Sequence, residues 1–239
     1  MPVNRNIVNI RPNIIRTSLR KSSPPINMNN SELAKSYGSV DKIWNNETVY
    51  LIGGGPSLLG FNWSLLSNKK TIAINKAYNV LPEAAVLYWT DVRFYNWFKA
   101  DIDNFKGLKV TCKLISTEYK DITILRTSSV EGLDMRPEYI CHGNNSGYGA
   151  INLAAKMGAK KIYLLGFDMA ATQTNTHWHS GYSVKHNTSI YPKMMNHFNC
   201  LPELLKQQGI EIWNANPNSM LTMFNKCTIE SAINDNPIL

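Results

Sequence analysis

The segment VYLIGGGPSL, residues 49–58, constrains the fold of this chain more than any other. An apolar run breaks into three glycines and continues as Pro-Ser-Leu, which predicts a buried β-strand that ends in a tight turn and opens a helix. Because glycine has no side chain, backbone N–H groups in such a turn can approach a phosphate closely. We therefore expect a nucleotide site that includes Gly53, Gly54, Gly55, Pro56 and Ser57.

The loop matches neither of the two common nucleotide-binding patterns. Leu58 stands where a G-x-G-x-x-G motif has its last glycine, and no Gly-Lys-Ser/Thr follows as in a Walker A loop. The alternative interpretation is a strand-to-helix turn that binds no ligand.

Strand-like and helix-like segments alternate through the rest of the chain. Strands are expected at 48–53, 71–75, 85–91, 108–112, 122–125, 160–168 and 210–214, and helices at 146–157 and 191–208, the second interrupted by Pro202. Several of the strands are continuous apolar runs, as a parallel sheet covered on both faces requires. The pattern predicts an α/β fold, a Rossmann-like, doubly wound, mostly parallel sheet with helices on both faces.

The length of 239 residues fits one such domain, which we place at residues 46–239. No apolar run approaches the roughly 20 residues of a membrane span, and the first residues lack the apolar core of a secretory signal. Four cysteines without C-x-x-C spacing indicate free thiols in a reducing compartment. We expect a cytoplasmic protein.

Residues 1–45 form a basic segment that we expect to be a flexible arm. It contributes to the net charge of +8 with Arg5, Arg11, Arg16, Arg20 and Lys21. Such an arm can contact nucleic acid or an anionic membrane surface, and its composition is also typical of a transit peptide. The plain alternative is a solvated tail.

Polar residues or glycines stand at the ends of many predicted strands. They are Gly53 to Gly55, Asn75, Asp91, Asp168 and Asn214. Ligands of open α/β sheets bind at the carboxyl ends of the strands, so we expect these residues to converge on one crevice. Taken singly, each Asn or Asp could instead cap the next helix or turn.

A second informative segment is HGNNSGYG, residues 142–149, which leads into a predicted helix. Ser146 is the candidate N-cap, with Asn144, Asn145 and Gly147 around the positive helix end. This is a second place for a phosphate or carboxylate, and the alternative is a capped loop without a ligand.

The third segment is THWHSGYSVKH, residues 176–186, which holds His177, His179 and His186. A histidine here can serve as a general base, because its ordinary pKa lies near working pH. The H-x-H spacing with a nearby Asp could instead bind a metal, although we assign no metal ligands. A polar surface loop is the third interpretation. An aromatic, charged segment, residues 89–97, either walls the crevice or covers core.

The order of these motifs over residues 48–224 resembles a known group of proteins. GGGPSL, IAIN, a strand ending in Asp, and NSGYGAINLAAKMGAKKIYLLGFDM are similar to the bacterial sialyltransferases of glycosyltransferase family 42. They also resemble the wider superfamily of motility accessory factors and archaeal 6-hydroxymethylpterin pyrophosphokinase-like proteins. Uncharacterised phage members of that superfamily carry a similar His-Trp-His segment.

The resemblance implies a GT-A-like variant of the fold and a CMP-linked sugar donor. The nucleotide would be held by Gly53, Gly55, Pro56, Ser57 and Asn75, and the donor site lined by Asn145, Ser146, Gly147 and Asp168. A later histidine would deprotonate the acceptor hydroxyl without a metal. The His-Trp-His segment departs from the sialyltransferase pattern, so His177, His179 and His186 all remain candidates. Tyr182 and Tyr191 are candidates for the phosphate-binding tyrosines.

Three functional hypotheses follow. The first is a glycosyltransferase that takes a nucleotide-sugar donor, has no separate cofactor and acts on a glycan or nucleic-acid acceptor, with Asp91 and Asn144 also at the donor. The second is a pyrophosphokinase-like or nucleotide-hydrolysing enzyme with Mg²⁺ on Asp91, Asp168 or the histidines. The third is a non-catalytic nucleotide-binding or virion-associated module that makes its contacts through the arm. Relatives of this kind often form homo-oligomers, and a phage-encoded member would lie in the host cytoplasm.

Overall fold

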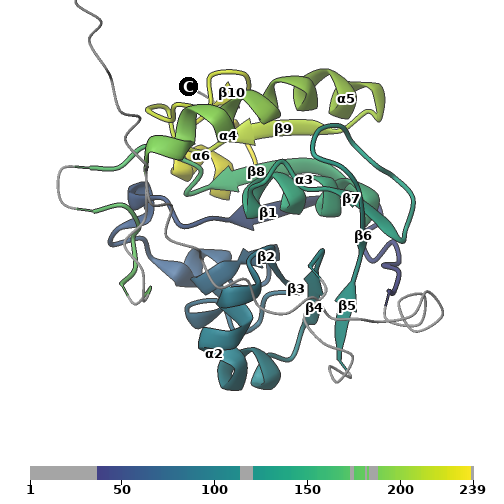
Figure 1. The fold of residues 1–239 in the computed structure, drawn as a ribbon. Helices are drawn as coiled ribbons and strands as arrows, with labels where there is room; N and C mark the ends of the chain where they lie inside the picture. The colour runs from purple at the N-terminus through teal and green to yellow at the C-terminus, as the bar shows by residue number, and fades with distance from the viewer. Residues whose placement is uncertain (1–36, 114–120, 173–174, 181, 183–187, 238–239) are drawn as a thin grey trace, which may run out of the picture.

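The computed structural model describes residues 37–113, 121–172, 175–180, 182 and 188–237. In this part of the chain eight strands form one sheet, in the order β10-β9-β8-β1-β2-β3-β4-β5 (Figure 1). All its pairings are parallel. In chain order its strands are β1 Glu47–Ile52, β2 Lys70–Ile74, β3 Val86–Trp89, β4 Leu108–Thr111, β5 Ile122–Ile124, β8 Ala159–Leu165, β9 Glu211–Asn214 and β10 Asn225–Lys226. A separate parallel pair joins β6 (Arg126–Ser129) to β7 (Tyr139–Cys141).

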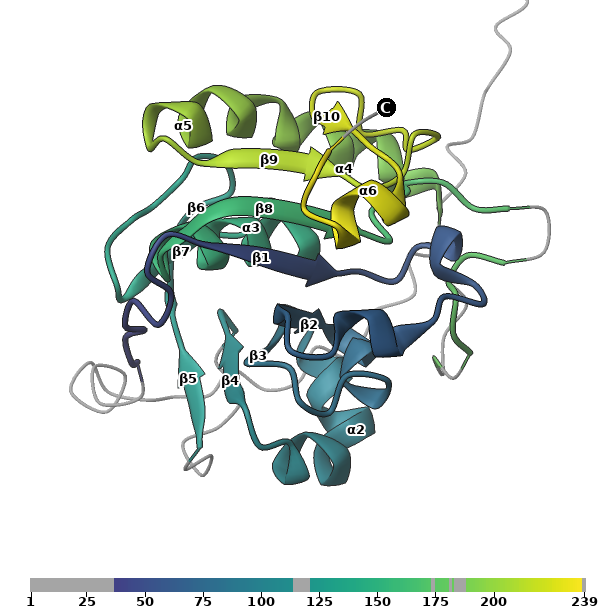
Figure 2. The ribbon, with the colours of Figure 1, turned by 180° about the vertical axis from the view of Figure 1, so that it is seen from behind.

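Helices cover both faces of the sheet. In Figure 1 α3 (Ser146–Lys156) lies in front of β1 and β8, and from behind, in Figure 2, α6 (Ile229–Ile233) lies in front of the same strands. Helix α5 (Leu201–Gln207) shares a core cluster with α3, whereas α2 (Val92–Asn104) shares the opposite cluster with α6. The Rossmann-like α/β fold predicted from the sequence is confirmed.

The first strand shows why the buried strands read as unbroken apolar runs. Val49 and Leu51 pack into the cluster on the α3 face, and Tyr50 and Ile52 pack into the cluster on the α2 face. All four side chains are buried, because alternate residues of a strand point to opposite faces and both faces are covered.

The order of the strands places a switch point between β1 and β8. From β1 the chain builds outward through β2, β3, β4 and β5, and it then returns to the other side of β1 as β8, β9 and β10. The connections on the two sides of β1 therefore diverge beyond the carboxyl ends of β1 and β8. In open α/β sheets this divergence leaves the crevice in which ligands bind.

Several predicted boundaries are wrong. The expected helix after the glycines is a single 3₁₀ turn, Pro56–Leu58, and the expected strand 160–168 ends at Leu165, because Gly166 adopts a φ of +70°. The expected helix 191–208 is divided into α4 (Tyr191–His197), a 3₁₀ turn (Phe198–Cys200) and α5. Pro202 lies in the first turn of α5, where its missing N–H costs no helical hydrogen bond.

The last residues of the predicted arm pack on the domain. Val40 and Trp44 are buried, and the N–H groups of Ile43 and Trp44 donate to the carbonyl of Met157. Gly158, with a φ of +102°, lets the Trp44 carbonyl approach, because a Cβ there would clash with that oxygen. Packed structure therefore begins before residue 46. Arg5, Arg11, Arg16, Arg20 and Lys21 of the arm lie outside the described residues.

Two further expectations concern the thiols and the membrane. All four cysteines are free, and Cys112, Cys141 and Cys227 are buried. Within the described residues, no helix has both the length and the apolar character needed to cross a bilayer.

Candidate functional site

A cavity of about 490 Å³ opens at the carboxyl edge of the sheet, at the switch point. It brings together most of the residues that the sequence singled out: Gly53, Gly54, Gly55, Asn75, Asp91, Asn144, Asn145, Ser146, Gly147, Asp168 and His177. The parallel sheet thus brings the ends of several strands together at one cavity. Of the predicted residues, Pro56, Ser57 and His179 do not line the cavity, and His186 lies outside the described residues.

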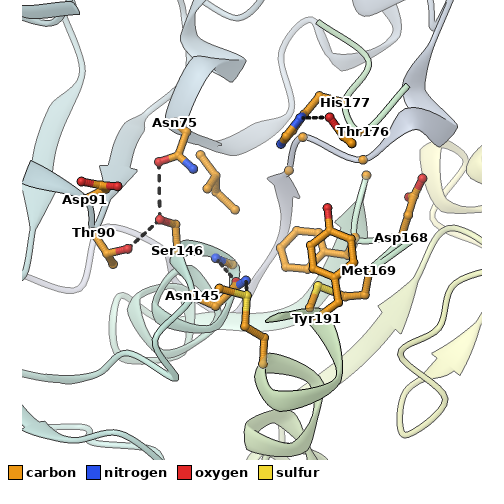
Figure 3. Close-up of a pocket in the computed structure, with 18 of the residues that line it drawn as sticks. Asn75, Thr90, Asp91, Asn145, Ser146, Asp168, Met169, Thr176, His177 and Tyr191 are labelled. Atoms are coloured by element: carbon orange, nitrogen blue, oxygen red, sulfur yellow. Dashed lines mark hydrogen bonds between the residues drawn. The ribbon is translucent and has the colours of Figure 1, made fainter. Parts of the chain in front are cut away.

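The walls of the cavity differ in chemistry (Figure 3). Asn75, Thr90 and Ser146 lie on one side, and Asp168, Met169 and Tyr191 lie on the opposite side. His177 and Thr176 close a third side in the same view. A ligand in the cavity would therefore meet amide and hydroxyl groups on one flank and an imidazole on another.

The glycine loop is held by β8 and is less free than the sequence suggested. The N–H groups of Gly53 and Gly55 donate to the carbonyls of Leu165 and Gly166, each at 2.8 Å. These two N–H groups are therefore committed to the protein. They are not free to bind a phosphate, and the nucleotide site expected at this loop stays a prediction.

Close packing explains the three glycines. A Cβ on Gly53 would lie 2.6 Å from the Gly166 carbonyl oxygen, and a Cβ on Gly55 would lie 2.5 Å from Asp168 Cγ. A Cβ on Gly54 would lie 2.8 Å from His177 Cδ2. The absence of side chains thus lets three segments, the loop, the turn after β8 and the histidine segment, meet at the floor of the cavity.

Asp168 joins the two loops at the switch point. Its Oδ2 accepts from the Ser57 N–H at 2.7 Å, and its Oδ1 accepts from the Ser57 hydroxyl at 2.6 Å. Such charge-assisted bonds to a buried carboxylate are among the stronger ones in proteins. In the structure Asp168 and Ser57 thus fix the geometry of the glycine loop, in which Pro56 is buried.

Helix α3 begins at the cavity, with Asn145 as its N-cap. Asn145 Oδ1 accepts from the N–H groups of Gly147 at 2.7 Å and Tyr148 at 3.2 Å. The prediction that Ser146 is the cap is therefore wrong by one residue. The Ser146 hydroxyl is instead available to side chains across the cavity wall, where it meets Thr90 and Asn75.

Removal of this cap gives a first testable expectation. Asn145→Ala should lower the free energy of unfolding by about 1 kcal/mol, because two N–H groups of the first turn lose their acceptor. Chemical denaturation measures the change. Asn145→Ser is the matched control, since serine is also an effective N-cap acceptor; an equal loss in both variants would contradict the assignment.

The histidine segment lies against the glycine loop. The Trp178 indole N–H donates to the Gly53 carbonyl at 2.8 Å, and the Trp178 backbone N–H donates to the Gly54 carbonyl at 3.1 Å. These bonds place the neighbouring His177 at the cavity, with its Nδ1 3.0 Å from Thr176 Oγ1. His179 lies outside the lining, its ring 5.2 Å from that of His177.

The pKa of His179 is lowered to about 4, mainly by burial and also by nearby Lys76, against a bond to the Ser180 carbonyl that raises it. The unfolded chain takes up this proton near pH 6.5, whereas the folded protein resists it down to about pH 4. The contribution of the neutral His179 to the free energy of unfolding is therefore fully present above about pH 6.5, and it is lost as the pH falls toward about 4.

The expected result is that wild-type protein loses more stability between about pH 7 and pH 4 than His179→Gln does. Thermal melting across this range measures it. His142, whose pKa is also lowered by burial, acts in the same direction, so the variant should reduce the acid sensitivity and leave part of it. Parallel pH profiles for the two proteins would contradict the assignment to His179.

The aromatic segment after β3, residues 89–97, both lines the cavity and covers core, which were the two alternatives that the sequence left open. It forms α2, in which Phe94 and Tyr95 are buried in the core, while Arg93 and Trp97 reach the rim of the cavity. Asp91 caps α2 and accepts from the Arg93 guanidinium, which lowers the pKa of that carboxyl. Both residues of this pair line the cavity.

Asn214, at the end of β9, does not join the site. Its amide is fully buried and donates to the Phe167 carbonyl and to Ser219 Oγ. Strand β9 stands one strand beyond the switch point, so its end supports the turn after β8 from behind. The expectation that Asn214 faces the shared crevice is wrong.

The carboxylates that line the cavity could bind a metal ion, but they already accept hydrogen bonds. Among the described residues, no group of three His, Cys, Asp or Glu side chains could hold a metal ion. The carboxylates named for Mg²⁺ already accept from donors, Asp91 from Arg93 and Asp168 from Ser57. Mg²⁺ would have to compete with these bonds for its oxygen ligands.

Sequence reasoning missed part of the lining. Thr90 directly precedes Asp91 at a strand end, and that position was a usable signal. Other residues carry no chemical signature and reach the cavity only through the path of the chain; they include Phe167, Met169, Ile190 and Met194. Tyr182 and Tyr191, candidates from the resemblance, both line it.

Comparison with known proteins gives one structural similarity. No protein-family model matches the chain, and no curated protein matches it. Among solved structures, the α-2,3-sialyltransferase from Campylobacter jejuni in its apo form is similar, with a TM-score of 0.47 and 14% sequence identity. The match covers 85% of this chain and 87% of that one. At this level of similarity, the activity of that protein does not transfer to this chain.

Proposed function

We propose that this protein is a glycosyltransferase that uses a nucleotide-sugar donor. The observation that carries the proposal is the cavity at the switch point, which has a polar flank of Asn75 and Ser146 and, on another side, a histidine. A volume of about 490 Å³ lies in the range of pockets that bind ligands of nucleotide size. Donor and acceptor could meet there between groups of different chemistry.

The donor would lie along the flank formed by β2, β3 and α3. The N-terminus of α3 presents the positive end of an eleven-residue helix to the cavity, which favours a phosphate or carboxylate. The Asn75 amide, the Ser146 hydroxyl and the Asn144 and Asn145 region supply uncharged polar contacts. The motifs that resemble family 42, including the glycine loop and Asn75, border the same space.

His177 is the residue that we propose as general base. Of the described histidines it alone lines the cavity, and the contact of its Nδ1 with Thr176 can fix the ring orientation. His179 stays neutral at working pH but is turned away from the lining. An acceptor hydroxyl beside His177 would lose its proton as it attacks the sugar carbon, and the nucleotide would leave with the bonding electron pair.

A ligand screen tests the function class. Thermal shifts would be measured with CMP, UMP, GDP, AMP, ATP and the matching sugar conjugates, with and without Mg²⁺. A ligand at a hundredfold excess over its Kd stabilises the native state by about 2.7 kcal/mol, which is readily detected. We expect a shift with a cytidine nucleotide or its sugar conjugate that does not depend on Mg²⁺.

Any other result of the ligand screen would support one of the alternative functions. A shift that needs ATP and Mg²⁺ would replace the proposal with a pyrophosphokinase-like or nucleotide-hydrolysing activity. The absence of any shift would favour a binding module whose partner contacts the basic arm. A follow-up assay of sugar release from the stabilising conjugate, with and without candidate glycan acceptors, separates turnover from binding alone.

A further inference from the structure

Three polar side chains are linked by hydrogen bonds along one wall of the cavity (Figure 3). The Thr90 hydroxyl lies 2.8 Å from Ser146 Oγ, and Ser146 Oγ donates to Asn75 Oδ1 at 3.4 Å. Thr90 follows β3, Ser146 begins α3, and Asn75 follows β2. The three side chains therefore connect three separately positioned elements at the place where the proposed donor lies.

The number of hydroxyl protons determines which group donates in each of these two hydrogen bonds. An amide carbonyl oxygen only accepts, so the bond between Ser146 and Asn75 uses the single hydroxyl proton of Ser146. The proton between Thr90 and Ser146 must then come from Thr90. With its oxygen engaged, Asn75 has its N–H₂ group on the cavity side, as Figure 3 shows.

The orientation of Asn75 depends on this contact. Its backbone adopts a φ of +51°, so the direction of its Cα–Cβ bond is set by the turn after β2. A flip of the side-chain amide would turn the oxygen to the cavity and the N–H₂ group to Ser146. The exchange would require both bonds to reverse, because an N–H₂ group cannot accept a proton: Ser146 would have to accept from Asn75 and donate to Thr90, which now donates to it.

We propose that Thr90 is a positioning residue, which acts through Ser146 to hold the Asn75 amide with its N–H₂ donors toward the ligand. The inference rests on the proposed nucleotide-sugar function and adds a specificity to it. The ligand atom opposite Asn75 must accept a hydrogen bond, as a phosphate, carboxylate or base carbonyl oxygen does. An amino group in that position would face two donors and would be rejected.

The variants Thr90→Val, Thr90→Ser and Ser146→Ala test the proposal through the affinity for the nucleotide identified in the screen. Thr90→Val removes the hydroxyl at nearly constant shape and should raise the nucleotide Kd about five- to tenfold, the usual effect of one lost hydrogen bond. Thr90→Ser should restore the affinity. In the Ser146→Ala background, Thr90→Val should have no further effect, since the connection is already broken.

Thr111→Val is the matched control. Thr111 Oγ1 donates to the Trp89 carbonyl in the neighbouring strand and does not line the cavity. We expect this variant to lower the melting temperature and to leave the nucleotide Kd unchanged. Independent, additive effects of Thr90→Val and Ser146→Ala, or a failure of Thr90→Ser to restore affinity, would overturn the proposal.

A measurement on the free protein separates this inference from the proposed function. The side-chain ¹⁵N–¹H₂ resonance of Asn75, assigned by its loss in Asn75→Asp, should move in Thr90→Val and stay in place in Thr90→Ser and Thr111→Val. A resonance unmoved by Thr90→Val overturns the positioning role whether or not any nucleotide binds. A wild-type protein that binds no nucleotide overturns the proposed function, and the resonance still decides the role of Thr90.

Discussion

Replacement of His177 by glutamine is expected to slow glycosyl transfer by about 10²–10⁴-fold, the usual contribution of a general base. The affinity for the nucleotide should change little, because His177 lies on a different side of the cavity from Asn75 and Ser146. Single-turnover kinetics and nucleotide titration measure the two effects separately. The same variant should also lose the acid limb of the pH–rate profile, in which protonation of a histidine base slows the reaction.

His179→Gln is the matched control for this prediction. The two histidines are two positions apart in one segment, but only His177 lines the cavity. His179→Gln should therefore retain turnover within a few-fold of wild type. Loss of turnover in His179→Gln with retention in His177→Gln would move the base to His179. Equal losses of rate and of nucleotide affinity in His177→Gln would show that it binds the donor and does not act as base.

Replacement of Gly55 by alanine is expected to lower the free energy of unfolding by about 3 kcal/mol, at the upper end of the cost of overpacking. The added Cβ would lie 2.5 Å from Asp168 Cγ and 2.6 Å from the Gly166 carbonyl oxygen. Neither neighbour can easily move, because Asp168 is held by Ser57 and Gly166 lies in backbone bonded to the loop. For a domain of this size the melting temperature should fall by about 6–12 °C.

Gly60→Ala controls for the loss of a glycine as such. Gly60 has a φ of +76°, and a Cβ there would meet nothing within 4 Å, so only backbone strain of about 1 kcal/mol is expected. Gly55 has a φ of −62°, which alanine adopts without strain, so its larger effect would come from contact alone. A loss in Gly55→Ala no greater than that in Gly60→Ala would contradict the packing at the switch point.

Local patterns were sufficient to predict much of the fold. The apolar runs of β1, β3 and β8 indicated strands buried on both faces, and the alternation with helices indicated a parallel sheet. From these two features it follows that Asn75, Asp91 and Asp168 lie at the same edge, because parallel strands share a carboxyl end. The helix α2 was missed although its residues are amphipathic, because the aromatic segment 89–97 was interpreted only as a wall of the crevice or a cover of the core.

For the residues of the site, too, part of the outcome follows from local sequence and part from tertiary contacts. The sequence by itself determined which residues reach the carboxyl edge of the sheet, because strand ends and helix starts are properties of local composition. Only the tertiary structure decided what those residues do there. It committed the N–H groups of Gly53 and Gly55 to the end of β8 and the turn after it, and it paired Asp168 with Ser57. It also left His177, and not His179, at the cavity. Each of these outcomes depends on contacts between segments more than 100 residues apart in the chain, and such contacts form only when the order of strands is set.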